Sequence, residues 1–140
     1  TIAGGGPEVE RVQKENIKYL GVLKHDEVYK FYNEIDILIL PSITTKFWKE
    51  QFGRVIVEAI SHGKVVMSSN SGAIPEGRGN LGLDYIFAEK DAKAMLEVLM
   101  KIQAESENEN LKIKMDKAQK LNVEKFSDNA FIKRVLSYAK

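Results

Sequence analysis

The sequence contains no cysteine, only three prolines and only two histidines. Without cysteine the chain has no disulfide bond, no thiolate metal site and no cysteine nucleophile. Two histidines are too few for a histidine-rich metal site. No apolar run approaches the ~20 residues that a membrane-spanning helix needs. What remains is material for one ordinary globular domain, because 44% of the 140 residues are hydrophobic and can form a core.

Neither sign of charge predominates: 21 basic and 20 acidic side chains leave a formal net charge of +1. Such a balance creates no overall field that would hold nucleic acid or an anionic membrane. We therefore expect no nucleic-acid partner, and a cytoplasmic protein that is at most peripheral to the inner face of a membrane. The motif Asp-x-Asp does not occur, so a diphosphate held through a metal has no support in the sequence. We predict neither a metal nor a cofactor.

Short apolar runs alternate with segments of helical periodicity over the first 90 residues. The predicted strands are 1–3, 17–20, 36–40, 65–68 and 85–87. The predicted helices are 7–14, 26–33, 53–62, 91–104, 111–121 and 127–139. This alternation predicts an α/β fold with a doubly wound, Rossmann-like parallel sheet and extra C-terminal helices. The run 36–40 is apolar on both faces, which suits a central strand.

Ligands of such folds bind beyond the carboxyl ends of the strands. The informative loops are therefore 4–7, 21–24, 41–52 and 70–76. The first begins with three glycines but is a poor dinucleotide fingerprint, because the third glycine of that motif would fall at Val9. Two explanations stay open for the loop around Gly5: an ordinary turn, or a support next to a ligand.

Two glutamates flank the start of the predicted helix 53–62. The free N–H groups of a helix start suit a phosphate, and Gly53 lacks a Cβ that would keep a ligand away. Glu50 precedes the helix and Glu58 lies about a turn and a half inside it, so at ~1.5 Å per residue they can reach different parts of one elongated ligand. Because carboxylates bind sugar hydroxyls and repel phosphate, this pattern fits a diphosphate with hydroxyls on both sides.

The same two glutamates also have a simpler explanation. Glu50 stabilises a helix dipole from its N-terminal side, and Glu58 is a solvated surface charge. Against this, Glu58 stands between Val57 and Ala59 in a mostly apolar helix, where a charge is seldom found without a partner. On the residues alone, both explanations remain open.

The segment EQFGRVIVEAISHGKVV resembles the E-x7-E region of retaining GT-B glycosyltransferases, especially glycosyltransferase family four. Four further segments match that family in order: GGGPE, IKYLGVL, YNEIDILILPS and SSNSGAIPE. The resemblance covers roughly residues 1 to 90. It implies the C-terminal half of a GT-B fold, which binds a nucleotide-diphosphate sugar and works in polysaccharide biosynthesis or a related pathway.

The resemblance also implies roles for the matched positions. Glu58 would hold the ribose hydroxyls of the nucleotide, and Glu50 would contact the transferred sugar as a positioning residue rather than as a catalytic base. Backbone N–H groups would be offered to the sugar and diphosphate by Phe52, Gly53 and Arg54. The base would face the main chain of Gly21, Val22 and Leu23.

The resemblance further implies that residues 1–140 form a nucleotide-sugar-binding domain without its first strand and helix. The Arg/Lys pair that the family supplies from that region has no counterpart here. The acceptor, a glycan or a lipid-linked molecule, would bind an N-terminal domain that is absent from this sequence. We therefore expect the 140-residue chain alone to have no transferase activity.

Two other functions were weighed against a hexosyltransferase. A GT-B-like sugar-nucleotide epimerase shares the sheet and the donor site, although the order of the motifs fits a transferase better. A non-catalytic α/β module, such as a nucleotide-binding or signalling receiver domain, would need an acidic cluster at strand ends in its receiver form. Asp36 instead begins its predicted strand, which argues against the receiver form.

Overall fold

The computed structural model describes residues 1–79, 81 and 83–127. Its contacts divide the chain into two compact units, an N-terminal unit of Thr1–Glu34 and a C-terminal unit of Ile35–Lys140. Each unit has its own secondary structure.

In the N-terminal unit, two extended segments run parallel to each other. They meet at a single bridge between Ile2 and Tyr19, where the Ile2 N–H donates to Lys18 O at 2.8 Å and the Leu20 N–H donates to Ile2 O at 2.9 Å. Helix α1, Val9–Lys14, connects the two segments. The predicted strands 1–3 and 17–20 are thus present as a parallel pair, but the pairing is only one bridge long.

Helix α2, His25–Glu34, completes the N-terminal unit. Its first turn is closed by the Glu27 carboxylate, which accepts a hydrogen bond of 2.7 Å from the Lys24 N–H. A carboxylate in this position satisfies one of the free N–H groups of a helix start. The helix predicted at 26–33 is therefore confirmed.

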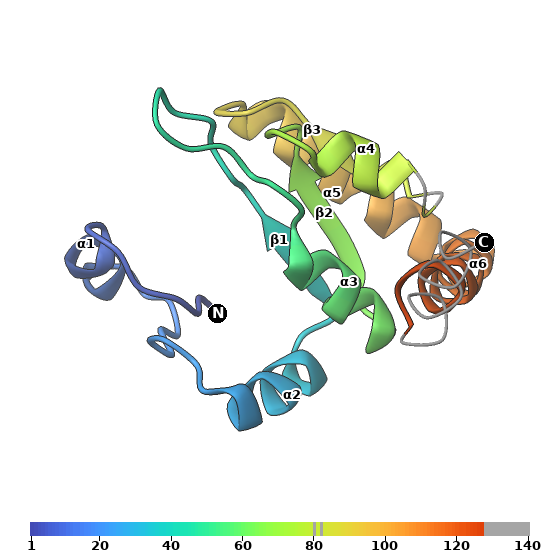
Figure 1. Cartoon of the computed structure of the whole chain (residues 1–140), viewed down its shortest axis with the longest axis horizontal. Helices are drawn as coiled ribbons and strands as arrows, with labels where there is room; N and C mark the ends of the chain where they lie inside the picture. Colours follow the sequence, from blue (N-terminus) through green and yellow to red (C-terminus); the bar gives the residue numbers. More distant parts are fainter. Residues whose placement is uncertain (80, 82, 128–140) are drawn as a thin grey trace, which may run out of the picture. The chain divides into compact units, whose positions relative to one another are not determined.

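The C-terminal unit is built on a parallel sheet of three strands in the order β1-β2-β3 (Figure 1). The strands are β1, Ile37–Leu40; β2, Val65–Ser69; and β3, Ile86–Phe87. All five residues of β2 are buried, so β2 is the central strand of this sheet. The sequence suggested that place for 36–40, but within this unit β1 lies at the edge. The residues of β1 are half-buried or exposed, with Ile39 at 41%, so the apolar run did not identify the central strand.

The helices of this unit pack against the sheet and against one another. Helix α3, Arg54–Ser61, connects β1 to β2 and contacts both strands; α5, Ala92–Ser106, contacts β2 and β3. Helix α6, Asn110–Phe126, packs against both α3 and α5. Its buried Asn122 joins it to α3 by donating hydrogen bonds to Val57 O at 3.1 Å and Ser61 Oγ at 2.8 Å.

The structure confirms an α/β fold with a parallel sheet, and it corrects two details. Helix α4, Ile74–Gly79, begins inside the segment 70–76 that we expected to be a loop. Its glycines hide the helix from a propensity argument, while Pro75 fits the first turn of a helix, where a missing N–H does no harm. Helices α5 and α6 are also longer than expected. The helix predicted at 127–139 lies outside the described residues from residue 128 onward.

Candidate functional site

Glu50 lies at the N-terminus of α3, as its place in the sequence suggested. Its Oε1 atom accepts hydrogen bonds from the Gly53 N–H at 3.0 Å and, at a longer 3.5 Å, from the Phe52 N–H. Its Oε2 atom accepts one from Ser42 Oγ at 3.3 Å. The partial positive charge of the helix start stabilises a carboxylate in this position. One oxygen is therefore fixed by the backbone, and the other has a single long contact.

The turn into α3 explains why residue 53 is glycine. Gly53 has a φ of 68°, in the left-handed region that favours glycine. A Cβ at this position would come within 2.8 Å of Ile56 Cδ1 and 3.6 Å of Leu40 Cδ2. The missing Cβ thus makes room for the side chains of Ile56 and Leu40. Phe52 precedes this turn, and its ring packs edge-on against Phe126 with 5.6 Å between centroids.

Glu58 lies on α3 one turn after Arg54, with which it pairs. The Arg54 Nε atom is 3.8 Å from Glu58 Oε1, and the two side chains are 87% and 40% exposed. Such a pair on a helix surface contributes about 0.2–0.5 kcal/mol. The charge in the apolar helix therefore has a partner, and the Glu58 carboxylate remains accessible to solvent.

The other predicted residues lie in the N-terminal unit, where two loops come together. The Gly4 N–H donates to Gly21 O at 2.7 Å, and a Cβ on Gly5 would lie 3.0 Å from Val22 Cγ2. Val22 is exposed, whereas Leu23 is half-buried. The structure thus brings the glycine loop and the 21–23 loop into contact.

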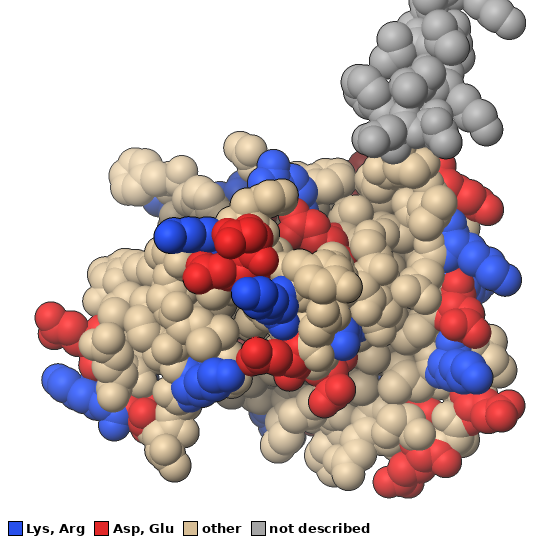
Figure 2. Space-filling view, turned by 90° about the horizontal axis from the view of Figure 1, so that it is seen from below, with Lys and Arg blue, Asp and Glu red and all other residues tan. Residues whose placement is uncertain are grey.

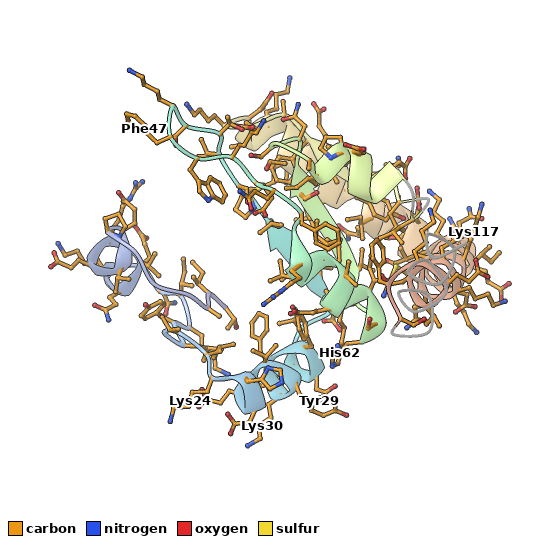
Figure 3. All side chains as sticks on the ribbon, in the orientation of Figure 1. Lys24, Tyr29, Lys30, Phe47, His62 and Lys117 are labelled. Carbon is orange, nitrogen blue, oxygen red and sulfur yellow. The ribbon has the colours of Figure 1, made fainter. Side chains whose placement is uncertain are left out.

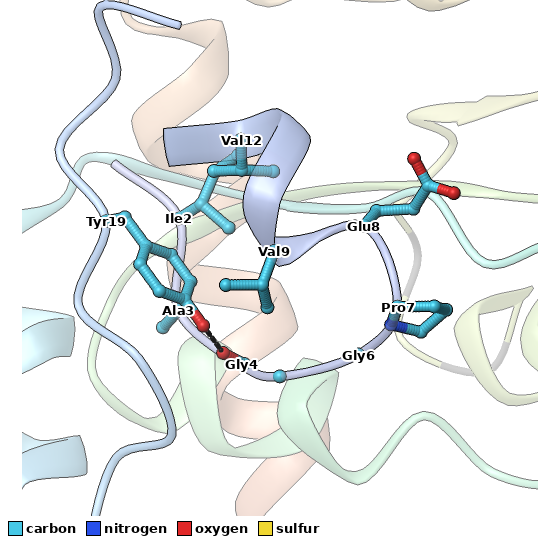
Figure 4. Close-up of a pocket in the computed structure, with 10 residues that line it drawn as sticks. Ile2, Ala3, Gly4, Gly6, Pro7, Glu8, Val9, Val12 and Tyr19 are labelled. Carbon is cyan, nitrogen blue, oxygen red and sulfur yellow. Dashed lines mark hydrogen bonds between the residues drawn. The ribbon is translucent and has the colours of Figure 1, made fainter. Parts of the chain in front are cut away.

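A cavity of about 240 Å³ lies beside the glycine loop (Figure 4). Its walls come from the loop itself, from α1 and from Tyr19, whose hydroxyl donates to Gly4 O at 2.8 Å. This hydrogen bond fixes the loop against the second extended segment. The loop around Gly5 is therefore an ordered turn that borders an open space.

A group of polar residues at the carboxyl ends of the strands of the C-terminal unit was not predicted from the sequence. We call it the strand-end network; together with Glu50 it comprises Ser42, Thr44, Ser71 and Glu89. Glu89 accepts hydrogen bonds from the Thr44 side chain and backbone, and these lower the pKa of its carboxyl group. The signal was present in the sequence, because an acid following the predicted strand 85–87 stands where parallel sheets bind ligands.

The middle of the loop 41–52 forms an exposed turn that carries two aromatic residues, Phe47 and Trp48. The Thr45 N–H donates to Trp48 O at 2.7 Å, while Thr45 Oγ1 accepts from the Phe47 N–H at 3.3 Å and the Trp48 N–H at 3.0 Å. Phe47 is 90% exposed and points away from the loop tip (Figure 3). The backbone of the turn is thus well held, although its aromatic rings contribute little to a core.

Charges are mixed over the surface of the molecule. On the face in Figure 2, acidic and basic side chains are interspersed, in agreement with the balanced composition. Among the described residues, no three His, Asp or Glu side chains are grouped so that they could hold a metal ion. No helix in the described part of the chain is long and apolar enough to cross a membrane.

The sequence can be compared with curated proteins. It is 34% identical over 92 residues to an uncharacterized 41.2 kDa protein in the cps region of Klebsiella pneumoniae, a match that covers 64% of this chain and 24% of the relative. It is 35% identical over 83 residues to the gpi3 subunit of phosphatidylinositol N-acetylglucosaminyltransferase from Schizosaccharomyces pombe, covering 54% of this chain and 17% of the subunit. The chain thus spans less than a third of the length of these relatives.

The fold also matches solved structures. A glycosyltransferase from Rickettsia africae ESF-5 aligns with a TM-score of 0.73 at 22% identity, covering 94% of this chain and 33% of that one. HepE from Anabaena, solved in complex with UDP and glucose, aligns with a TM-score of 0.64 at 22% identity, covering 94% and 35%. The model of one family, glycosyl transferases group 1, matches residues 1–105. This chain therefore belongs to the glycosyl transferases group 1 family.

Proposed function

We propose that the chain carries the donor site of a retaining glycosyltransferase, which transfers a hexose from a nucleotide-diphosphate sugar to a glycan or lipid-linked acceptor. The observation that carries the proposal is the placement of two acids at one helix, Glu50 before its start and Glu58 within it. The Glu50 carboxylate accepts from the Gly53 N–H at 3.0 Å at the start of α3, and the accessible Glu58 carboxylate lies farther along it. The match to HepE, which was solved with UDP and glucose, supports a donor of this class.

In this proposal each acid binds hydroxyl groups of a different part of the donor. Glu58 accepts from the ribose hydroxyls, with Arg54 beside it to hold the carboxylate in place. Glu50 accepts from hydroxyls of the transferred sugar through Oε2, since its Oε1 is held by the backbone. Both are positioning contacts, and neither acid needs to change its protonation state.

In this proposal the diphosphate lies at the start of α3, where the Arg54 N–H and the helix dipole favour negative charge. The N–H groups of Gly53 and Phe52 donate to Glu50 Oε1 and so hold the neighbouring carboxylate. During transfer the bond between the sugar C1 and the diphosphate oxygen breaks, and a bond from C1 to the acceptor oxygen forms on the same face. The departing diphosphate takes the acceptor proton. The helix start stabilises the charge that develops on the leaving group.

The proposal is tested by titrating the protein with UDP-glucose and GDP-mannose, and with UDP and GDP alone, in a calorimeter. We expect saturable binding of one nucleotide sugar and of its bare nucleotide. Binding of none of the four would contradict the proposal. Incubating the full-length protein with the bound nucleotide sugar and no acceptor separates the two enzyme classes, because an epimerase would release an epimer of the sugar.

A further inference from the structure

Glu89 binds Thr44, a residue 45 positions away in the sequence. It follows β3, and its two carboxylate oxygens accept hydrogen bonds from one residue, Thr44: the backbone N–H at 2.6 Å and Oγ1 at 2.6 Å. Its own N–H donates to Asn70 Oδ1 at 3.0 Å. A carboxylate that binds two donors of the same residue fixes both position and orientation, and charge-assisted hydrogen bonds are roughly twice as strong as neutral ones.

We call the two hydrogen bonds between Glu89 and Thr44 the clamp. The clamp is linked by further hydrogen bonds to the loop after β2. The Thr44 hydroxyl gives its proton to Glu89, so it accepts the proton of Ser71 Oγ at 3.0 Å. Ser71 is fully buried. The residue after it, Gly72, lies so close to the Glu50 backbone that an added Cβ would be 2.0 Å from Glu50 O. The Ala73 N–H donates to the same Glu50 oxygen at 3.0 Å.

A second line of hydrogen bonds reaches the Glu50 side chain. Ser69 Oγ in β2 donates to Ser42 O at 2.6 Å, and Ser42 Oγ donates to Glu50 Oε2 at 3.3 Å. Glu50 is thus connected to the loop after β2 through its backbone and to the end of β2 through its carboxylate and Ser42. Few apolar contacts hold the loop 41–52, since Ile43, Phe47 and Trp48 are all exposed. Hydrogen bonds therefore determine its course.

We infer that Glu89 is a positioning residue of the donor site, which holds the loop 41–52 through Thr44 and thereby keeps the Glu50 carboxylate at the start of α3. The inference rests on the proposed function, because it assigns Glu89 an effect on the sugar that Glu50 binds. Glu89 itself does not touch the donor. Its removal frees the middle of the loop and lets Glu50 leave the position in which Oε2 meets the sugar.

The test compares a nucleotide sugar with its bare nucleotide. The variants Glu89→Ala and Thr44→Val are titrated with UDP-glucose and UDP, and with GDP-mannose and GDP. We expect roughly tenfold weaker binding of the nucleotide sugar, as for the loss of one charge-assisted hydrogen bond, and nearly unchanged binding of the nucleotide. Thr44→Ser keeps the hydroxyl and the N–H, so it restores the affinity. Glu97→Ala removes an exposed carboxylate on α5 and serves as the charge control.

The outcomes distinguish the inference from the proposed function. If the unaltered protein binds neither nucleotide sugar, the proposed function fails and the inference fails with it. If it binds one and the Glu89→Ala and Thr44→Val variants bind that nucleotide sugar equally well, the inference alone is wrong. Equal weakening of nucleotide sugar and nucleotide would mean that Glu89 supports only the general fold, which also overturns the inference. Urea unfolding of each variant confirms that it is folded during the titration.

Discussion

The C-terminal unit contains two groups of acidic side chains that are held in opposite ways. In the strand-end network, Glu50 and Glu89 are held by hydroxyl groups and backbone N–H groups. In the second group, which we call the Tyr85 cluster, Asp84 and Glu105 are held by lysines: Lys101 Nζ lies 2.5 Å from Asp84 Oδ2, and Lys114 Nζ is 2.8 Å from Glu105. Completing the Tyr85 cluster, the Tyr85 hydroxyl donates to Glu105 at 2.7 Å.

The kind of donor that holds the carboxylates suits the two groups to different roles. Lysine ammonium groups neutralise the carboxylates of the Tyr85 cluster, and the cluster joins the start of β3 to α5 and α6. Neutral donors orient the carboxylates of the strand-end network without cancelling their charge. Glu50 Oε2, which is held by one contact of 3.3 Å, therefore keeps the capacity to accept a hydrogen bond from a ligand. Changes in the Tyr85 cluster should therefore affect stability, and changes to the carboxylates of the strand-end network should affect binding.

Gly72→Ala tests the backbone contact on which the strand-end network depends, and we expect it to have the largest effect. The new Cβ would lie 2.0 Å from Glu50 O at a φ of +54°, so overpacking and backbone strain add. The free energy of unfolding should fall by about 3 kcal/mol, measured by urea denaturation. Gly63→Ala is the matched control: its φ is +71°, but the nearest atom is the flexible Gln119 Nε2 at 3.3 Å. A similar loss in both variants would show that the contact with Glu50 does not matter.

Glu58→Ala should separate binding from stability. If Glu58 binds the ribose, its removal weakens binding of UDP or GDP by roughly 10- to 100-fold, as expected for a hydrogen bond to a charged group. Stability should change by less than about 0.5 kcal/mol, because the pair with Arg54 is exposed. Calorimetry and urea denaturation measure the two quantities, with Glu97→Ala as the control. An unchanged affinity would remove Glu58 from the donor site.

Sequence reasoning placed Glu50 and Glu58 well because the signals for them are local. An apolar strand, a glycine and a periodic helix lie within about 20 residues of one another, and each element is specified by its own spacing. The position of Glu50 at the start of α3 follows from these elements alone. Local spacing did not explain why residue 53 must be glycine. The structure explains it, because a Cβ at this position would collide with Ile56 in the core.

The clamp between Thr44 and Glu89 could not be predicted in the same way. The two residues are 45 positions apart, and neither has a neighbouring residue that indicates the contact. They meet only because β1, β2 and β3 are parallel and adjacent, which brings the loops after the strands to one edge of the sheet. The order of the strands had to be known first, and an apolar run does not reveal it.

Glu105→Gln tests the Tyr85 cluster and should show the reverse of Glu58→Ala. The substitution keeps the size of the side chain but removes the charge that pairs with Lys114. Lys114 keeps a second, more distant partner in Asp84, whose Oδ1 atom is 3.7 Å from Nζ. Stability should fall by about 1 kcal/mol, at the upper end for a partly exposed ion pair because the side chain of Glu105 is only 16% exposed. Affinity for UDP or GDP should not change. Weakened binding in this variant would contradict the division between the two groups.

The smallest expected effect concerns pH: the difference in stability between the unaltered protein and Glu105→Gln should depend on it. The hydrogen bonds from Lys114 and Tyr85 hold the pKa of Glu105 below its usual value of 4.5. A carboxylate with a lowered pKa contributes stability above its unfolded pKa and loses it as the pH falls through the folded value. The pKa of Lys114 is raised, mainly by the hydrogen bond to Glu105, so the contribution of Lys114 to stability is complete below pH 10.5.

The difference in stability between the unaltered protein and Glu105→Gln should therefore be constant between about pH 6 and 9 and shrink below about pH 4.5. Urea midpoints across this range measure it, and a difference that persists undiminished to pH 3 would mean that the charge of Glu105 does not stabilise the fold.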